Sequence, residues 1–430
     1  MKSLYNFNYL TSNLCYNKAM KKLSYLILSY LISLLSVCLT PSVSADEFQA
    51  AAKHAIAIEA TTGKVLYDKD ASTPDEIASI SKILSIYLVY KEIHEGKLSW
   101  DTEIPISDYA YDLTQNSMAS NVPLEKREYT VRELVNASMI ASANSATIAL
   151  AEHIAGTESQ FVDKMTQQLK TWGITDAKLV NATGLNNSML GDHIYPNSKS
   201  DDENQMSALD VAKIAQHLIT DYPEILDITK KNTYTFDGSA IHTYNYMLKG
   251  QGYYREGVDG LKTGTTELAG ASFVGTSIEN NMRIITVVLD ADNYARFEVT
   301  NQLLDYVLTN FKKVKVVSKG QTYAKSSFTI EDGKKASAPA VAASDFYVIR
   351  QKSDQKELNV KTSLDQSVPV APIKKGQKVG QISFKDDNLI GSGYTGKAPS
   401  IDLVSKESVQ KSFFLKVWWN HFVKYVNEKL

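Results

Sequence analysis

Hydrophobic and polar positions follow helical and strand-like periods along residues 54–311 of the 430-residue chain. Apolar residues three or four apart predict helices, whereas short runs rich in β-branched and aromatic residues predict strands. The helices expected are about 79–95, one that begins at Thr130, about 145–154, about 207–219, and one traced by Phe297, Leu303, Leu304, Val307, Leu308 and Phe311. Between two of them, residues 186–205 are polar and predict a long loop, which inside a domain is often functional.

Strands from the two ends of this region are expected to meet in one sheet. Runs at 54–60 and 64–70 flank Thr61-Thr62-Gly63 and predict a hairpin. The segment 260–266 is followed by runs at 271–278 and 283–290, whose short connections predict antiparallel neighbours. We therefore expect an α/β (α+β) domain over 46–316, in which an antiparallel sheet is flanked by helices.

Helical periodicity stops after Phe311. From Val314 to about Leu403, short strands alternate with turns rich in Gly, Asp, Ser and Lys, which predicts a small all-β domain at 317–405. No catalytic constellation stands out in this segment.

The end of the chain, 406–430, predicts an amphipathic helix from about Ser408 to Leu430. On a helical wheel Phe414, Leu415, Trp418, Trp419, Phe422, Tyr425 and Val426 gather on one side, opposite Lys416, Asn420, Lys424, Asn427 and Glu428. Charge interrupts this run too often for a bilayer span, which needs ~20 mostly apolar residues. Its aromatic and lysine side chains instead favour a helix lying in the membrane surface. The alternative is a helix packed on the β-domain or on a partner.

The first 45 residues have the pattern of a secretory signal peptide. Lysines precede an apolar run from Leu23 to Leu39, and small residues lead up to Ala45. Starts at Met1 and at Met20 both fit. The only cysteines, Cys15 and Cys38, lie in this leader, which excludes disulfides, thiol catalysis and zinc-thiolate sites from the exported chain. Without the four leader lysines the formal net charge falls from −2 to about −6, which argues against nucleic acid as a partner.

A candidate for chemistry opens the helix at 79–95. Ser79 and Lys82 stand three residues apart and so share a face. The amine can take the proton of the hydroxyl, while the free N–H groups of the helix start favour negative charge on the serine oxygen. Ser-x-x-Lys also occurs in helices where the serine is a cap and the lysine is solvated.

Three motifs follow one another in order: Ser79-Ile-Ser-Lys82, Ser142-Ala-Asn144 and Lys262-Thr263-Gly264. This order resembles the serine penicillin-recognising enzymes, which carry Ser-x-x-Lys, Ser-x-Asn and Lys-Thr-Gly. The longer phrases IASISKIL, SANSATIALAEHIAG and GVDGLKTGTTELAGASFVG look specifically like D-alanyl-D-alanine carboxypeptidases, the low-molecular-mass penicillin-binding proteins of the peptidase S11 type. The similarity covers residues 50–315.

The resemblance implies a penicillin-recognising transpeptidase/β-lactamase-like fold and a definite activity. Such an enzyme removes the terminal D-Ala from peptidoglycan stem pentapeptides during cell-wall synthesis and remodelling. It is inhibited covalently by β-lactams, and it is exported and held peripherally at the outer face of the bacterial cytoplasmic membrane.

The same resemblance assigns roles to the motif residues. Ser79 is the matched nucleophile and Lys82 its base, which must be neutral, so burial beside Lys262 should lower its pKa. Ser142 relays a proton to the leaving amine, and Asn144 holds Lys82 and a substrate amide.

The resemblance also assigns substrate binding to the third motif. The substrate would pair as an added strand with Lys262-Thr263-Gly264, and Thr263 would bind its carboxylate. The oxyanion hole would be the backbone N–H groups of Ser79 and Thr265. Arg296 stands where some relatives place an arginine facing that carboxylate, although a surface arginine that starts a helix fits equally well.

Two other classes of protein share part of this pattern. A class A β-lactamase has the same fold and motifs, but it uses a Glu-x-x-Leu-Asn loop, and none occurs between Asn144 and Lys262. A non-catalytic penicillin sensor or wall-binding protein could keep Ser-x-x-Lys yet lose another motif, whereas all three are intact here. The seven histidines are scattered and no His-Glu-x-x-His occurs, so we expect no metal and no cofactor.

Overall fold

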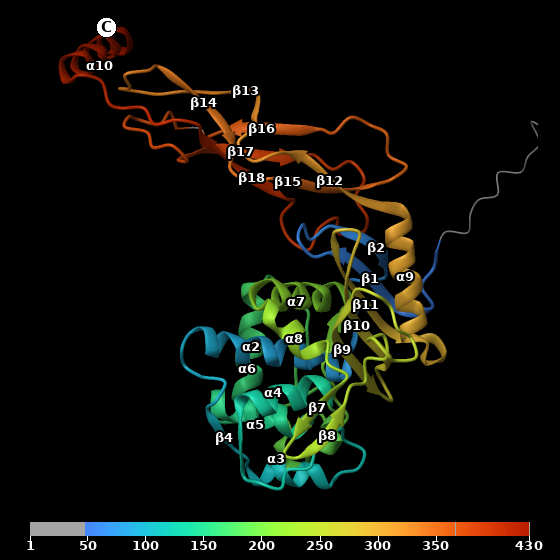
Figure 1. Cartoon of the computed structure of the whole chain (residues 1–430). Helices are drawn as coiled ribbons and strands as arrows, with labels where there is room; N and C mark the ends of the chain where they lie inside the picture. Colours follow the sequence, from blue (N-terminus) through green and yellow to red (C-terminus); the bar gives the residue numbers. More distant parts are fainter. Residues whose placement is uncertain (1–47, 366, 430) are drawn as a thin grey trace, which may run out of the picture. The chain divides into compact units, whose positions relative to one another are not determined.

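The computed structural model describes residues 48–365 and 367–429 (Figure 1). Residues Ala50–Leu430 form one unit. The predicted signal peptide at 1–45 lies outside the described residues.

The predicted sheet is present and has five strands in the order β2-β1-β11-β10-β9. Every neighbouring pair is antiparallel, with Ile56 opposite Val287 and Thr263 opposite Phe273. The strands are β1 (Ala52–Glu59), β2 (Val65–Lys69), β9 (Val258–Thr266), β10 (Gly270–Glu279) and β11 (Met282–Ala291). The first two and the last three strands thus come from opposite ends of the domain, as their hydrophobic runs predicted.

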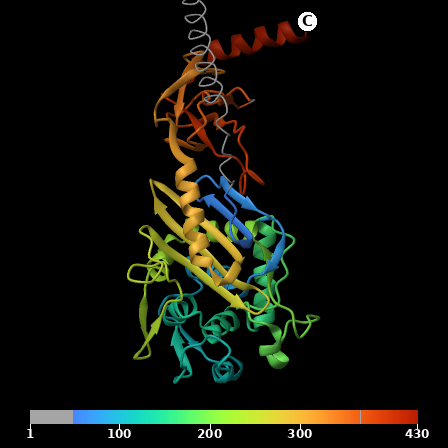
Figure 2. The ribbon, with the colours of Figure 1, turned by 90° about the vertical axis from the view of Figure 1, so that its right-hand side faces the viewer.

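Helices cover both faces of this sheet. One face carries α9 (Arg296–Asn310), whose Phe297 ring lies 5.1 Å from that of Phe273 (Figure 2). The other face, which includes Ile58, Ile285 and Val287, joins the main core with the helices α2 (Lys82–His94), α4 (Val131–Ile140), α5 (Asn144–Ala155), α6 (Glu158–Thr171) and α7 (Ala208–Asp221). The domain core therefore lies between the sheet and the helices that carry two of the three motifs.

Local signals in the sequence set where these helices begin. Thr130 accepts from the backbone N–H of Glu133, and the Glu133 carboxylate accepts from the Thr130 N–H, which is the capping box that the sequence predicts. Ser207 caps α7 in the same way by accepting from Asp210 N–H at 3.1 Å.

Shorter elements fill the connections. They are β3 (Pro74–Glu76), η1 (Ala78–Ser81), β4 (Glu103–Pro105), α3 (Asp108–Asp112), η2 (Leu113–Gln115), β5 (Glu128–Thr130), η3 (Asn187–Met189), η4 (Gly191–His193), β6 (Gln205–Ser207), η5 (Pro223–Ile225), α8 (Leu226–Thr229), β7 (Thr233–Phe236), β8 (Ser239–His242) and η6 (Asp292–Tyr294). The polar stretch at 186–205 contains only two of these short 3₁₀ turns before β6, in agreement with the loop predicted there.

The C-terminal part is the all-β domain that the sequence predicts. A two-stranded pair joins β12 (Phe311–Val317) to β15 (Phe346–Gln351). A five-stranded sheet has the order β13-β14-β18-β17-β16, with β13 (Thr322–Thr329), β14 (Ser337–Ala342), β16 (Val360–Leu364), β17 (Lys378–Phe384) and β18 (Ser400–Ser405). Its core includes Phe328, Phe346, Ile382 and Leu403. The sequence of β14, SAPAVA, consists of small residues and a proline and so carries a weak strand signal.

A buried ion pair joins this domain to the hairpin of the first. The amine of Lys64 contacts the Asp386 carboxylate at 2.5 Å and the Ile349 carbonyl at 3.0 Å, with the Lys64 side chain only 1% exposed. Tyr394 also donates to Asp386, at 2.8 Å. This contact requires both Lys64 and Asp386, because a buried charge is tolerated only when it is paired and hydrogen-bonded.

The predicted terminal helix is shorter than expected. Helix α10 spans Phe414–Lys429, so the start near Ser408 is wrong. Val409 instead exchanges two backbone hydrogen bonds with Ile373 and is 2% exposed, which ties this residue into the β-domain. The side chains of Phe414, Leu415, Trp418, Trp419, Phe422 and Tyr425 are each between 47% and 67% exposed. Over the described residues, none of the helices has the length and apolar character that crossing a membrane requires.

Candidate active site

Ser79 lies in a 3₁₀ turn that leads directly into a helix. The turn is η1 (Ala78–Ser81), and α2 begins at Lys82, so the predicted helix is present with a tighter first turn. The Ser81 hydroxyl donates to the Ala78 carbonyl at 2.8 Å and stabilises this turn. Ser79 is half-buried, which leaves its hydroxyl accessible to a substrate.

Lys82 is fully buried and its amine has three oxygen neighbours. It contacts Ser79 Oγ at 3.0 Å, Asn144 Oδ1 at 2.7 Å and the Thr183 carbonyl at 2.8 Å. The amide and peptide oxygens can only accept, whereas a serine hydroxyl can accept or donate. A neutral amine therefore satisfies every partner: its two N–H groups donate to Asn144 and Thr183, and its lone pair accepts the hydroxyl proton of Ser79.

The surroundings favour that neutral form. Burial lowers the pKa of Lys82 well below its ordinary value, and the positive charge of Lys262 lowers it further. The carboxylate of Glu158 acts in the opposite direction. Lys262 is buried as well, and burial together with the charge of Arg296 lowers its own pKa to about 7.

The second motif occupies the turn before α5. Ser142 is buried and has the left-handed φ of 57°, and Asn144 is the first residue of the helix. Asn144 is held by Ser120, whose carbonyl accepts from its backbone N–H at 2.9 Å and from its side-chain amide at 2.8 Å. Among the described residues the Ser142 hydroxyl forms no hydrogen bond, so the structure brings Ser142 to the site without joining it to Lys82.

The third motif lies on β9, the last strand of the five-stranded sheet. A Cβ added to Gly264 would lie 2.7 Å from the Ile77 carbonyl and 3.2 Å from Ile80 Cγ1, so the strand passes directly against the Ser79 turn. Only a residue without a side chain permits this approach. Because β9 pairs only with β10 among the described strands, its other edge is available to an added strand.

Arg296 belongs to the same group of residues. Its guanidinium donates to the Gly264 carbonyl at 2.9 Å and to Thr265 Oγ1 at 2.7 Å. The side chain is partly buried, and it thus joins the start of α9 to the motif strand. This contact distinguishes it from a solvated arginine at a helix start.

The segment that completes the site belongs to none of the three motifs. Asn181 Oδ1 accepts from Thr183 N–H, Thr183 Oγ1 and Gly184 N–H, which holds the Thr183 carbonyl in front of Lys82. Gly184 has φ +82°, and an added Cβ would lie 1.8 Å from the Ala78 carbonyl. The Asn-Ala-Thr-Gly sequence is a turn signal that could have drawn attention to this segment.

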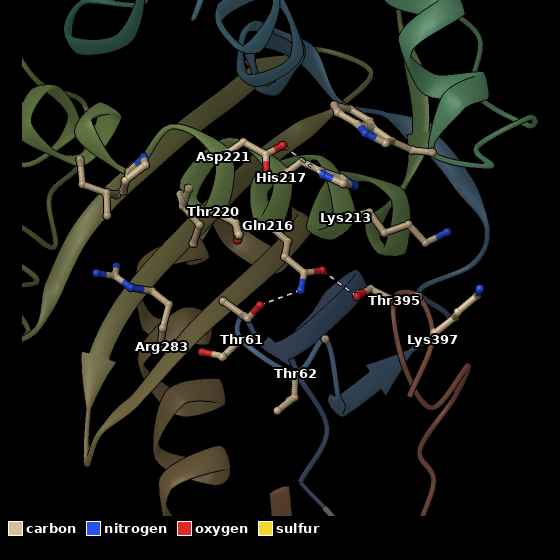
Figure 3. Close-up of a pocket in the computed structure, with 17 residues that line it drawn as sticks. Thr61, Thr62, Lys213, Gln216, His217, Thr220, Asp221, Arg283, Thr395 and Lys397 are labelled. Carbon is tan, nitrogen blue, oxygen red and sulfur yellow. Dashed lines mark hydrogen bonds and ion pairs between the residues drawn. The ribbon is translucent and has the colours of Figure 1, made fainter. Parts of the chain in front are cut away.

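A cavity of about 680 Å³ lies away from this chemistry. Its lining includes Thr61, Lys213 and Gln216 from the first domain and Thr395 from the second (Figure 3). Gln216 donates to the Ala60 carbonyl and accepts from Thr395 Oγ1, each at 2.6 Å. None of the motif residues lines it, so the hydrogen-bonded group around Lys82 lies outside this cavity. Within residues 48–365 and 367–429, no cluster of three His, Cys, Asp or Glu side chains is arranged to hold a metal ion.

Comparison with known proteins identifies two family matches. The model of the D-alanyl-D-alanine carboxypeptidase family, peptidase S11, matches residues 40–293, and that of the penicillin-binding protein 5 C-terminal domain matches residues 311–411. The D-alanyl-D-alanine carboxypeptidase DacF of Bacillus subtilis is 28% identical over 411 residues, which is 91% of this chain and 96% of the relative.

Two solved structures extend the similarity. A peptidoglycan synthesis regulatory factor (PBP3) from Streptococcus pneumoniae is 50% identical with a TM-score of 0.81, over 84% of this chain and 100% of that one. Penicillin-binding protein D2 from Listeria monocytogenes, in its ampicillin-bound form, is 28% identical with a TM-score of 0.52, over 61% and 99%. The chain belongs to the D-alanyl-D-alanine carboxypeptidase family, peptidase S11.

Proposed function

We propose that this protein is a serine D-alanyl-D-alanine carboxypeptidase that removes the terminal D-Ala of peptidoglycan stem pentapeptides through an acyl-enzyme on Ser79. The observation that carries the proposal is the set of contacts around Lys82. Its amine lies 3.0 Å from Ser79 Oγ and has fixed acceptors in Asn144 and Thr183. In the neutral form, two N–H groups bond to these acceptors and the lone pair is left for the Ser79 hydroxyl. A base held in this way is ready to activate the nucleophile.

The reaction has two acyl-transfer steps. Ser79 Oγ attacks the carbonyl carbon of the penultimate D-Ala and its proton passes to Lys82. As the C–N bond breaks, that proton is delivered through Ser142 to the leaving D-Ala amine, and an ester on Ser79 remains. Water then attacks the ester with Lys82 as base, and Ser79 recovers its proton.

The substrate is recognised along β9. Its backbone pairs with the free edge of the strand beside Lys262 and Gly264, and its terminal carboxylate lies against Thr263, Thr265 and Arg296. The developing oxyanion is bound by the N–H groups of Ser79 and Thr265. Support comes from Arg296, whose contact with Thr265 Oγ1 places a positive charge beside this strand.

β-Lactams are inhibitors of the same site, because their strained amide acylates Ser79 in place of the peptide. A class A β-lactamase uses a glutamate carboxylate to activate water on the acyl-enzyme. The buried Glu158 is not free to do so, since both of its oxygens already accept hydrogen bonds, from Ala182 N–H at 2.8 Å and from the Tyr109 hydroxyl at 2.7 Å. A long-lived penicilloyl adduct is therefore expected.

Labelling and product analysis test this function. The wild-type protein and Ser79→Ala are incubated with fluorescent penicillin and, separately, with a pentapeptide that ends in D-Ala-D-Ala. Mass spectrometry should find one penicilloyl group on Ser79 and release of a single D-Ala, both lost in Ser79→Ala. Labelling of another serine in the variant would show that the nucleophile is assigned wrongly.

Delivery to the membrane is part of the proposal. The signal peptide at 1–45 exports the chain, and the exposed aromatic face of α10 lies in the outer surface of the cytoplasmic membrane. Trp418, Trp419 and Phe422 are 62%, 57% and 47% exposed, an apolar area that a soluble surface rarely leaves uncovered. We further propose the functional bounds 46–316 for the catalytic domain, 317–405 for the β-domain and 406–430 for the anchoring segment.

A further inference from the structure

We propose that Glu158 is a positioning residue for the general base: its buried carboxylate fixes the segment whose carbonyl holds Lys82, and its charge acts on the same buried amine. The inference rests on the proposed function, since it assigns Lys82 the role of base. None of the three motifs includes Glu158.

Glu158 is buried and both of its oxygens are used. It is the first residue of α6, directly after the capping Thr157, and it is 5% exposed. Oε1 accepts from Ala182 N–H at 2.8 Å and Oε2 accepts from the Tyr109 hydroxyl at 2.7 Å. A carboxylate placed so deeply is costly unless it is bonded in this way, so its presence needs a reason beyond packing.

The bond to Ala182 leads directly to the base. The carbonyl of Ala182 accepts from Ser85 Oγ at 2.5 Å, so this residue is held on both its N–H and its C=O side. The next residue is Thr183, whose carbonyl accepts from Lys82 Nζ at 2.8 Å. Glu158 and Ser85 therefore fix the peptide that orients Lys82, and the lone pair of the amine is aimed at Ser79 as a result.

Charged and titratable groups lie around both Glu158 and Lys82. Glu158 is faced by Tyr109 on α3, Glu152 on α5 and Lys82 on α2, and His193 stacks on the Tyr109 ring at 3.9 Å. Lys82 is faced by Lys262 on β9 and by Glu158, and Arg296 acts on Lys262. Lys82 thus lies between one cation that opposes its protonation and one carboxylate that favours it.

The charges of Lys262 and Glu158 determine in which direction the protonation of Lys82 changes with pH. Burial raises the pKa of Glu158 to about 7, so the carboxyl changes charge near neutral pH. Ionised Glu158 raises the pKa of Lys82 and so opposes formation of the neutral base. Replacing the carboxylate by a neutral group of the same shape should let Lys82 lose its proton at lower pH.

Glu158→Gln separates charge from shape. The glutamine carbonyl can accept from Ala182 N–H, and its amide can donate to the Tyr109 oxygen. The second-order rate of Ser79 acylation by fluorescent penicillin is measured from pH 5 to pH 10. Glu158 is ionised only above about pH 7, so we expect the Glu158→Gln profile to rise at lower pH than that of the wild type in this range.

Asp163→Asn is the matched control. Asp163 lies on the same helix, and its carboxylate also accepts from a tyrosine hydroxyl, that of Tyr195 at 2.6 Å, but at the surface. The same isosteric change at Asp163 should leave the acylation profile unmoved. A shift in the control equal to that of Glu158→Gln would show that the effect is not local.

Tyr109→Phe keeps the inference testable if Glu158→Gln does not fold. It removes only the hydroxyl whose hydrogen bond lowers the pKa of Glu158. Glu158 then stays protonated to higher pH, so the acidic limb should move in the same direction by a smaller amount.

Two negative results have different meanings. If Glu158→Gln is acylated with the wild-type profile, the charge of Glu158 does not act on Lys82 and this inference is wrong, while the proposed function stands. If the wild-type protein itself forms no adduct on Ser79, the proposed function fails first.

Discussion

Asn144 and Lys82 are 62 residues apart in the chain, yet the Asn144 side-chain oxygen lies 2.7 Å from the Lys82 amine. Asn144 itself is held on the opposite side by the Ser120 carbonyl, which accepts from both of its nitrogen atoms. The oxygen of Asn144 is therefore committed to Lys82. The orientation of the Lys82 amine depends on this arrangement as much as on the one-turn spacing to Ser79.

Lys82→Arg should be nearly inactive although it keeps the positive charge. A guanidinium does not lose its proton in proteins, so it cannot accept that of Ser79. We expect the acylation rate with fluorescent penicillin to fall by at least ~100-fold, the lower end of what general-base catalysis contributes. The control is Lys91→Arg on the same helix, where the lysine contacts Gln168 at 2.9 Å and the rate should not change. Near wild-type acylation of Lys82→Arg would rule out Lys82 as the base.

Gly184→Ala should damage both stability and acylation. The left-handed φ of +82° costs an alanine roughly 1–2 kcal/mol, and its Cβ would also collide with the Ala78 carbonyl, next to the nucleophile. Gly191 has φ +56° with nothing within 4 Å of an added Cβ, so Gly191→Ala isolates the backbone cost. Denaturant unfolding and penicillin acylation are measured for both. Equal losses in the two variants would contradict a tight contact between residues 184 and 78.

The Lys64–Asp386 pair should couple the two domains. Lys64→Met or Asp386→Asn leaves one buried group without its partner, which typically costs about 3–5 kcal/mol. The double variant should lose less than the sum of the two single variants. The exposed pair Lys230–Asp227 provides the comparison, because surface pairs contribute only about 0–1 kcal/mol. Unfolding free energies that add without coupling would argue against an interdomain role for the buried pair.

Removal of residues 413–430 should release the protein from membranes without loss of activity. The cut keeps the segment in which Val409 pairs with Ile373 and Ser412 donates to Gly333. It removes the exposed contacts of His421 with Asp332 and of Lys424 with Glu331. The truncated protein is tested for binding to vesicles with anionic lipid and for D-Ala release. Continued full binding to vesicles would contradict the role of α10.

Charge substitutions in the full chain test the same face without truncation. Trp418→Glu with Trp419→Glu should abolish vesicle binding, because both side chains belong to the exposed apolar face. Asn420→Glu with Asn427→Glu adds the same charge on the polar face and should reduce binding far less. Equal effects would indicate that net charge, and not insertion of the aromatic face, controls binding.

The sequence by itself determined the elements and the chemical class of the site. A helical hydrophobic period located α2 and α7, because one-sided burial imposes the period of the helix on its sequence. Continuous β-rich runs located β10 and β11, which are buried on both faces. The cap at Thr130 was readable for the same local reason. The three motifs predicted that Ser79, Lys82 and the strand of Lys262 form one site, since each motif is short and its geometry is set within one turn or strand.

Only the tertiary structure decided how these pieces act together. Arg296 meets Thr265, Glu158 reaches Lys82 through Ala182 and Thr183, and Lys64 meets Asp386, all across long separations in the chain. The start of α10 was also decided there, because backbone pairing of Val409 with the β-domain prevents an earlier helix. Such contacts depend on where the chain returns after packing, and no local period or propensity encodes that position.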